Sequence, residues 1–337
     1  MDLDLIRCFK PMKLGNHKFE MPLILAPMAG VSDMPFRSLC SQLGADYCVS
    51  EMITSRIELW KTQKTKQRLL AGDLSPKIIQ IVGGDASLMA ESASRACENG
   101  AEIVDINMGC PAKKVCRKAA GSALLADPLL VAKIINAVVR ASDRPVTLKI
   151  RTGPNPGHRN GLLIAKIAES EGIAAVAIHG RSKDCRYDVP AEYETIAEVK
   201  ASVRIPVLVN GDITCGQSAL KALRETNADG LMIGRASQGN PWIFPLVRAA
   251  LNGKNWKKPD MPERLEVLHS FLESLYEHYG FESGSRIARK HLIWFLGYQP
   301  QGGYLTRDIV KRLESSVKQL NFVRNLKQEI ENKEYGK

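Results

Sequence analysis

The sequence predicts a (β/α)8 TIM barrel followed by a small all-α helical bundle domain. Eight short apolar runs recur between residues 23 and 233, and stretches of helical periodicity separate them. Each run is continuously apolar, as expected for parallel strands whose two faces are both covered. Eight such units at this length are typical of a closed barrel of ~250 residues and fit an open doubly wound sheet less well.

The individual elements follow from this alternation. The predicted strands are 23–26, 47–50, 77–82, 102–106, 146–150, 174–178, 207–209 and 230–233. The predicted helices between them are 34–43, 54–69, 87–98, 128–140, 161–170, 191–200 and 216–225. A hairpin at 11–22, turning at Gly15-Asn16, precedes the first strand. Because no GxGxxG motif follows that strand, a dinucleotide-binding Rossmann domain is not favoured.

The composition changes around residues 252–259, and the chain beyond them has helical periodicity. Leu265, Leu268, Leu272 and Leu275 recur at the spacing of one buried helix face. The predicted helices of this part are 262–279, 283–296, 306–320 and 323–334. We therefore divide the chain into a barrel domain, 1–252, and a helical domain, 253–337.

The charge of the chain favours a polyanionic partner. The formal net charge is +11, and the segments Lys61–Arg68 and Lys113–Lys118 contain no acidic residue. A solvated basic surface is the alternative interpretation of each segment.

The remaining composition is that of an ordinary globular protein. Hydrophobic residues make up 45% of the chain and charged residues 25%, and no apolar run reaches the ~20 residues of a membrane span. The acidic start Met1–Leu5 lacks the features of a signal peptide. The eight cysteines have neither zinc-ligand spacing nor the pattern of a disulfide framework. We expect a cytoplasmic monomer without a metal site.

The stretch Asp105–Lys114 is the most informative one in the chain. A buried strand ends there, and Gly109, Cys110 and Pro111 follow it directly. Four cations without a nearby carboxylate come next, namely Lys113, Lys114, Arg117 and Lys118. Cations lower the pKa of a thiol and also attract phosphates. A buried structural cysteine is the alternative, but the strand-end position and the charge together favour a functional Cys110.

Polar residues lie at the carboxyl ends of the predicted strands, where the active sites of such barrels are found. In chain order they are Ser50, Glu51, Gln80, Asn107, Cys110, Lys149, Arg151, His179, Arg181, Asn210, Asp212 and Arg235. Any one of them could be structural. Packing does not explain so many polar residues at strand ends, however, because buried polar atoms must find hydrogen-bond partners. Asn210-Gly211-Asp212 and Gly234-Arg235 follow the last two strands, where barrels commonly bind phosphate. This pattern indicates a phosphorylated ligand.

Lys149 ends a buried strand, so its ammonium group must be paired, neutral or facing a ligand. It could form a Schiff base, as in barrel aldolases, or stabilise negative charge on a reduced cofactor. His179 could donate a hydrogen bond or transfer a proton, and a neutral histidine with a structural role is the alternative.

Six stretches together resemble the tRNA-dihydrouridine synthases, most closely the bacterial B-type subgroup. They are Ala26–Asp33, Asp105–Lys114, Leu148–Gly153, Ile178–Arg181, Asn210–Ile213 and Met232–Arg235. The similarity runs from about Leu14 into the helical region, where Arg286–His291 is also similar to the subgroup. The Asn-Met-Gly-Cys-Pro loop is the most specific of these motifs.

The resemblance implies a barrel that binds FMN and a helical domain that binds tRNA. It implies NADPH-dependent reduction of the uracil C5–C6 bond in the tRNA D-loop, with position 17 as the target by analogy. Cys110 would be the general acid, and Asn107 would help to orient the uracil. Residues holding the flavin would be Pro27, Met28, Ala29, Gln80, Lys149, His179, Asn210, Gly211, Asp212, Gly234 and Arg235. Our own candidates for a basic rim that contacts the RNA are Lys113, Lys114, Arg117, Lys118, Arg286, Arg289 and Lys290. A solvated charged face is the alternative for each of them.

The implied chemistry is physically consistent with these residues. Uracil reduction needs a hydride at C6 and a proton at C5, and a thiol is a suitable proton donor if it is protonated before turnover. The base must also be flipped out of the folded RNA, which a basic rim would assist. Three other functions are open: a flavin barrel acting on a free pyrimidine, similar to dihydroorotate dehydrogenases; a lyase with Lys149 as Schiff base; and an RNA-binding module without catalysis.

Overall fold

The strands of the chain close into a parallel barrel. The computed structural model describes residues 11–297 and 305–335, so the acidic segment Met1–Leu5 lies outside the described residues. Within them, nine strands form one sheet in the order β4-β3-β11-β10-β9-β8-β7-β6-β5, and every neighbouring pair is parallel. These strands are β3 (Leu23–Leu25), β4 (Tyr47–Cys48), β5 (Ile53–Thr54), β6 (Ile78–Val82), β7 (Ile103–Met108), β8 (Val146–Arg151), β9 (Ala175–His179), β10 (Val207–Asn210) and β11 (Gly230–Ile233). A bridge between Val49, just after β4, and Ile78 of β6 closes the sheet on itself, which confirms the predicted (β/α)8 barrel.

Two short strands share the second position of the barrel, where the sequence predicts one. β4 pairs with β3 and β5 pairs with β6, while the residues between them leave the ladder. Glu51, in this interval, instead accepts a hydrogen bond from the backbone of Gly30. The predicted helix 54–69 is therefore wrong at its start, because β5, the 3-10 helix η2 (Ile57–Lys61) and α2 (Gln63–Leu69) occupy it.

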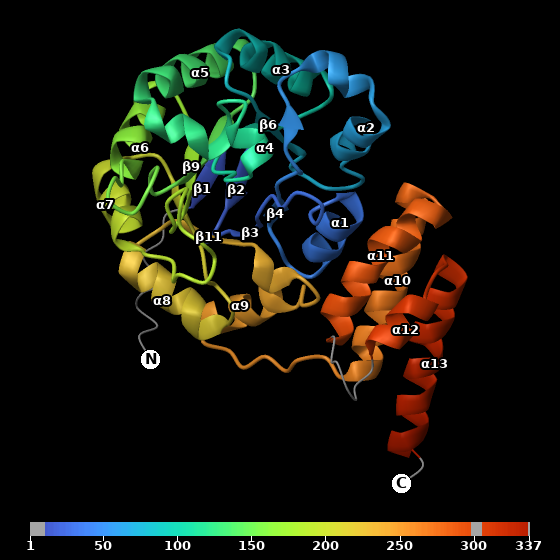
Figure 1. Cartoon of the computed structure of the whole chain (residues 1–337). Coiled ribbons are helices and arrows are strands. Elements are labelled where there is room, and N and C mark those ends of the chain that lie inside the picture. Colours follow the sequence, from blue (N-terminus) through green and yellow to red (C-terminus); the bar gives the residue numbers. More distant parts are fainter. Residues whose placement is uncertain (1–10, 298–304, 336–337) are drawn as a thin grey trace.

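Helices surround the barrel on the outside (Figure 1). Besides α2 they are α1 (Met34–Gln42), α3 (Ala86–Glu98), α5 (Pro128–Ala141), α6 (Gly161–Ser170), α7 (Glu194–Ser202), α8 (Gly216–Thr226) and α9 (Ile243–Leu251). Aspartate or threonine caps recur at their starts, as where Asp127 accepts from the backbone of Leu130. α9 and the single-turn α4 (Lys113–Cys116), in the loop after β7, were not predicted. One turn is too short to carry a periodic pattern.

The predicted hairpin closes one end of the barrel. β1 (Met12–Leu14) pairs with β2 (His17–Phe19) in antiparallel register, with the turn at Gly15-Asn16. Met12 and Leu14 are buried in one cluster with inward-facing barrel residues such as Ile24 and Tyr47. The amino-terminal end of the barrel is thereby filled, and the carboxyl ends of the strands are left for a site.

Within the described residues, four helices follow the barrel, and the first of them packs against α1 (Figure 1). We call them the helical region: α10 (Met261–Tyr279), α11 (Phe281–Leu296), α12 (Arg307–Arg312) and α13 (Ser316–Tyr335). The first two match their predictions, but the predicted break at 321–322 is wrong. Asn321 is an exposed residue of a continuous α13, and the break comes at 313–315, where buried Leu313 turns into the core.

A shared apolar core joins the barrel to the helical region. Phe36 of α1 is fully buried and contacts Phe271 of α10 and His291 of α11, with ring centroids 6.0 and 5.7 Å away. The predicted domain boundary at residue 252 falls in the connection between α9 and α10 and stays a prediction. Within the described residues, no helix is both long and apolar enough to cross a membrane.

Candidate active site

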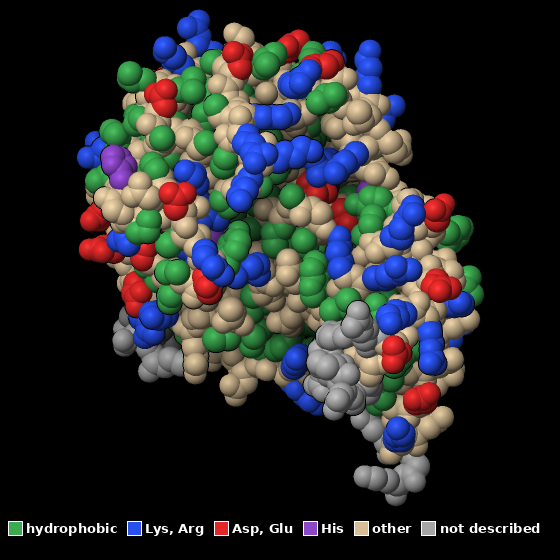
Figure 2. All heavy atoms as spheres, viewed as in Figure 1, with side chains coloured by type: hydrophobic (Ala, Val, Ile, Leu, Met, Phe, Trp, Pro, Cys, Tyr) green, Lys and Arg blue, Asp and Glu red, His purple; other side chains and the backbone are tan. Residues whose placement is uncertain are grey.

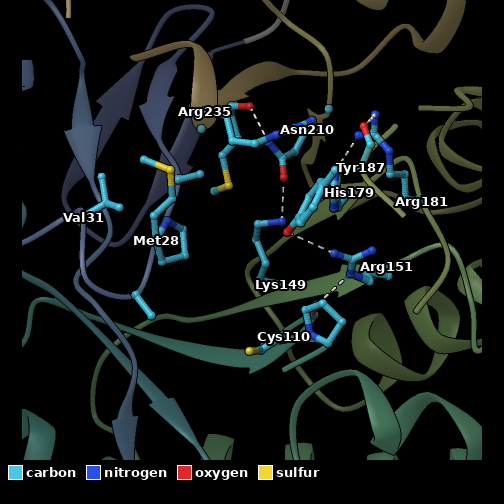
Figure 3. Close-up of a pocket in the computed structure, with 18 of the residues that line it drawn as sticks. Met28, Val31, Cys110, Lys149, Arg151, His179, Arg181, Tyr187, Asn210 and Arg235 are labelled. Carbon is cyan, nitrogen blue, oxygen red and sulfur yellow. Dashed lines mark hydrogen bonds between the residues drawn. The ribbon is translucent and has the colours of Figure 1, made fainter. Parts of the chain in front are cut away.

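A cavity of about 950 Å³ opens at the carboxyl ends of the barrel strands. Its size lies within the range of small-molecule and cofactor sites. The structure brings together the residues that were predicted to hold the cofactor, and with them Asn107 and Cys110. Those that line it are Pro27, Met28, Ala29, Gln80, Asn107, Cys110, Lys149, His179, Asn210, Gly211, Asp212, Gly234 and Arg235. Figure 3 shows how several of them face the cavity from different strands.

Lys149, on β8, is a buried lysine with an ordered partner. Its Nζ donates to Oδ1 of Asn210 over 2.9 Å, and Nδ2 of Asn210 donates to the Met232 carbonyl over 2.7 Å (Figure 3). Burial and the nearby Arg151 together lower the pKa of Lys149 to about 7, although Asp105 acts in the opposite direction. An ammonium group has three donors and a neutral amine has two, so in either form Lys149 can still donate to a ligand atom.

A chain of buried amides and a carboxylate lies below Lys149. Asp105 accepts from Oγ1 of Thr147 over 2.5 Å and from Nε2 of Gln80 over 2.7 Å. Oε1 of Gln80 in turn accepts from Nδ2 of Asn107 over 2.9 Å. Burial raises the pKa of Asp105 to about 6 against the effect of these hydrogen bonds. The network therefore sets the amide orientation of both Gln80 and Asn107.

Asn107 also holds the backbone of the cysteine loop. Its Oδ1 accepts from the backbone N–H groups of Gly109, at 3.2 Å, and Cys110, at 3.0 Å. The Cys110 carbonyl accepts from both the backbone and the hydroxyl of Ser122, and the Gly109 carbonyl accepts from Nε of Arg151. The loop that carries the thiol is thus fixed at several points.

The environment of Cys110 keeps its thiol protonated. Burial raises the pKa of Cys110 above its ordinary value, although Arg151 acts in the opposite direction. The cation that acts on the thiol is therefore Arg151 from the neighbouring strand, and the lysines that follow in the sequence are exposed on α4. A protonated thiol facing a cavity can serve as a proton donor.

His179 and a group of arginines form the opposite wall. Because NH1 of Arg181 can only donate, its 3.2 Å contact makes Nε2 of His179 an acceptor and leaves the proton on Nδ1. Burial, with the surrounding cations, holds the pKa of His179 far below its usual range, so the ring is neutral. Arg181 bonds Asp212 through two contacts of 2.7 and 2.8 Å, and Arg235 bonds the same carboxylate at 3.1 Å.

The comparisons with known proteins bear on this arrangement. Residues 24–332 match the family described as Dihydrouridine synthase (Dus). This chain belongs to the dihydrouridine synthase family. It is 49% identical to tRNA-dihydrouridine synthase B of Pseudomonas aeruginosa, over 96% of this chain and 98% of that protein. It is 51% identical to the protein of that name from Pseudomonas syringae pv. tomato, over 93% of each chain.

A solved structure shares the fold of this dihydrouridine synthase family member at low sequence identity. The 6-hydroxypseudooxynicotine amine oxidase (HisD) of Pseudomonas geniculata N1 aligns with a TM-score of 0.56 and 13% identity. The alignment covers 74% of this chain and 50% of that chain. The likeness therefore concerns the architecture alone.

The predicted basic residues of this chain lie outside the cavity wall. Lys113, Lys114, Arg117 and Lys118 lie on α4 and just after it, at the surface. Arg286 on α11 is exposed and paired with Glu282, Arg289 is half-buried, and Nζ of Lys290 donates to the Gly30 carbonyl. Figure 2 shows lysine and arginine side chains on both sides of the hollow between the barrel and the helical region.

Three residues of the site received no role from the sequence. Arg151 and Arg181 lie at strand ends, and this position in the sequence could have assigned them to the site. Tyr187 lies in the loop after β9, and its ring is 4.4 Å from the guanidinium of Arg235 and 5.7 and 5.8 Å from those of Arg151 and Arg181. Nothing in the local sequence indicates this position, since it arises from the path of the loop.

Within residues 11–297 and 305–335, no three His, Cys, Asp or Glu side chains are grouped as a metal site. The seven cysteines in this part of the chain are free thiols.

Proposed function

We propose that this chain reduces the C5–C6 double bond of a D-loop uridine in tRNA to 5,6-dihydrouridine, with FMN as cofactor and NADPH as reductant. The observation that carries the proposal is the position of the Cys110 thiol, which faces the same cavity as the buried Lys149. Burial raises the pKa of this thiol, which favours a proton donor. Family membership and the relatives named tRNA-dihydrouridine synthase B support tRNA as the substrate.

The residues of the cavity fit both the ring and the phosphate of a flavin mononucleotide. Lys149 keeps donors beyond its bond to Asn210, and Gln80 is oriented by Asp105 so that one amide hydrogen remains. The guanidinium of Arg235 is half exposed and can form charge-assisted bonds with phosphate oxygens. The predicted contacts of Pro27, Met28, Ala29, His179, Asn210, Gly211, Asp212 and Gly234 with the cofactor stay proposals.

The protein residues have separate tasks in this reaction. Reduced FMN, when bound, supplies the hydride that C6 of the uracil receives. Cys110 gives the proton of its Sγ to C5, and the resulting thiolate regains a proton from solvent. Asn107 and Arg151 hold the backbone of the cysteine loop, so the thiol keeps one position during the transfer. Lys149 stabilises negative charge on the group bound beside its ammonium, and Asn107 orients the uracil through its amide.

The target base must leave the RNA stack to reach Cys110, because the thiol lies inside the barrel. Lys113, Lys114 and Arg117 on one side and Arg286, Arg289 and Lys290 on the other would bind the backbone phosphates during this step.

An anaerobic spectrum tests the proposal. The purified protein is reduced with NADPH and mixed with tRNA that lacks dihydrouridine, and the flavin absorbance is followed. We expect reoxidation by this tRNA but not by free uridine or by fully modified tRNA. Reoxidation by a free pyrimidine would instead favour a flavin enzyme that acts on free pyrimidines. A colourless protein in which borohydride traps a substrate on Lys149 would favour the Schiff-base lyase.

A further inference from the structure

A second cavity, of about 670 Å³, lies at the junction of the barrel and the helical region. Its walls come from the loop after β3, from the interval between β4 and β5, and from α2, α10 and α11. Ala29 lines both this cavity and the active-site cavity, so the two adjoin. Figure 2 shows acidic side chains in the hollow between the barrel and the helical region, with lysines and arginines around them.

The wall shared by the two cavities is held from both sides. The Gly30 N–H donates to Oε1 of Glu51 over 2.6 Å, and the Gly30 carbonyl accepts from Lys290 of α11. Arg68 of α2 donates to the same Oε1 of Glu51 over 3.2 Å. Gly30 has φ of +77°, a conformation that glycine adopts without strain. The junction cavity is therefore a built part of the structure and not a loose gap.

One carboxylate oxygen of Glu51 is free to accept a hydrogen bond in this cavity. Its side chain is only 6% exposed, and both of its hydrogen-bond partners among the described residues bind Oε1. Oε2 has no such partner, although a carboxylate oxygen can accept two hydrogen bonds. Oε2 is thus free to accept from a ligand that enters the cavity. A ligand with N–H donors fits an acceptor in this position.

The rest of the lining suits a nucleotide. Asp33 adds a second carboxylate, whose oxygens each have one partner, the Phe36 N–H at 3.1 Å and the Tyr279 hydroxyl at 3.0 Å. Gln63, Lys64 and Gln67 contribute amides and a cation from the acid-free segment of α2. Carboxylates accept from the amino and imino edge of a base, and a lysine can bind its phosphate.

We propose that the junction cavity binds the base of a nucleotide next to the target uridine, and that this base is guanine. Guanine presents two adjacent donors, N1–H and the N2 amino group, to the free oxygen of Glu51. Adenine and cytosine each offer one amino group, and uracil offers only N3–H. The inference rests on the proposed function in one respect, that RNA is the substrate.

The experiment uses synthetic tRNAs in which the nucleotides on each side of the target are guanosine, inosine or adenosine in turn. Inosine keeps N1–H and lacks only the N2 amino group. For the native protein we expect kcat/KM and affinity to fall about tenfold or more from guanosine to inosine at one of the two positions, the effect of one charge-assisted hydrogen bond. For Glu51→Gln, which keeps an oxygen for the Gly30 N–H, we expect the preference to shrink to less than about twofold.

Glu58→Gln is the matched control, because Glu58 is exposed on the neighbouring η2 and pairs with Arg56. It should keep the native preference. Equal kcat/KM and affinity for guanosine, inosine and adenosine in the native protein would overturn the guanine site, even if Glu51→Gln did not fold. A preference for guanosine over inosine that survives in folded Glu51→Gln would overturn the role of Glu51. Affinities are measured alongside turnover, so a protein that binds with the guanosine preference but reduces none of the RNAs would count against the proposed function alone.

Discussion

At the scale of single residues, the site depends on how burial sets protonation. Cys110 follows a strand end beside several cations in the sequence, which would suggest a thiolate. In the fold, those lysines are exposed and burial raises the pKa of the thiol. The raised pKa therefore favours the protonated thiol, which is the form that a proton donor needs.

We expect Cys110→Ser to retain bound FMN and to be reduced by NADPH at the native rate. Reduction of tRNA should slow ~100-fold or more, because a hydroxyl is a much weaker acid than a thiol. Single-turnover oxidation of the reduced protein by unmodified tRNA measures this step. Cys116→Ser is the control, since Cys116 lies in the same loop and contacts the Cys110 carbonyl. A native rate in Cys110→Ser would contradict the acid role.

Lys149 links protonation to stability. The folded protein binds a proton at this site only below a pH of about 7, while in the unfolded chain the ordinary lysine pKa is 10.5. Between these values the unfolded state binds more protons, so the contribution of Lys149 to stability rises with pH and is at its lowest below pH 7.

We therefore expect the difference in free energy of unfolding between Lys149→Met and the native protein to change with pH. Methionine has no proton to lose, so the variant should be favoured most at pH 7, and the native protein should gain on it up to pH 10. Urea unfolding at several pH values measures the difference. Lys133→Met, at an exposed position of α5, controls for the loss of a lysine. A difference that is constant from pH 7 to pH 10 would refute the assignment.

At the scale of elements, the amino-terminal hairpin acts as a plug. Its inward residues Met12 and Leu14 complete the interior of the barrel below the site. The short turn was readable from Gly15-Asn16, but the location of the hairpin under the barrel was not.

Leu14→Ala should lower the free energy of unfolding by ~2–5 kcal/mol, because it leaves a void in a closed interior. Lys13→Ala, at the exposed position between the two plug residues, should change it by less than ~0.5 kcal/mol. Urea denaturation of both variants makes the comparison. Similar values for the two would show that the hairpin is not part of the core.

Gln319 of α13 ties the helical region together. Its Oε1 accepts from the Tyr276 hydroxyl of α10 over 2.6 Å. Its Nε2 donates to the carbonyls of Ser285 in α11 and Leu313 after α12, over 3.0 and 2.9 Å. Since the residue is fully buried, its three partners have no access to water as a substitute.

Gln319→Leu should therefore destabilise the protein by at least ~2 kcal/mol through the polar groups left without partners. Gln328→Leu on the exposed side of the same helix is the matched control and should be nearly neutral. Chemical denaturation followed by tyrosine and tryptophan fluorescence reports the difference. Equal stability of the two variants would contradict the central role of Gln319.

At the scale of the whole molecule, charge and shape act together. The net charge of +11 is distributed so that exposed cations of α4 and α11 lie on both sides of the hollow (Figure 2). Binding of a polyanion releases counterions, so the affinity should fall steeply with salt.

Replacing Lys113, Lys114 and Arg117 together by glutamine should weaken tRNA binding and flatten its salt dependence. The slope of log Kd against log salt should fall by about one unit for each phosphate that the variant no longer neutralises. Replacing Lys133, Arg140 and Lys166 of α5 and α6 by glutamine removes the same charge elsewhere and is the control. Titrations at several salt concentrations give both slopes. If the two triple variants have the same slope, the rim lies elsewhere.

Much of the fold and the site was readable from local patterns. Continuous apolar runs mark parallel strands covered on both sides, and polar residues directly after them fall at one end of the barrel. That is why Cys110, Lys149 and Asn210 were predicted together and do line one cavity. Family membership was likewise readable, because the motif around Cys110 lies within a single loop.

The tertiary structure alone decided the contacts between distant residues. Gln80, Asp105 and Asn107 form one network, Tyr187 lies against arginines of three strand ends, and Glu51 holds the Gly30 loop at the junction with α11. The division of the second strand into β4 and β5 was likewise visible only in the structure. A pattern along the chain reports periodicity and turns, whereas burial, protonation and hydrogen-bond partners depend on what folding brings next to each side chain.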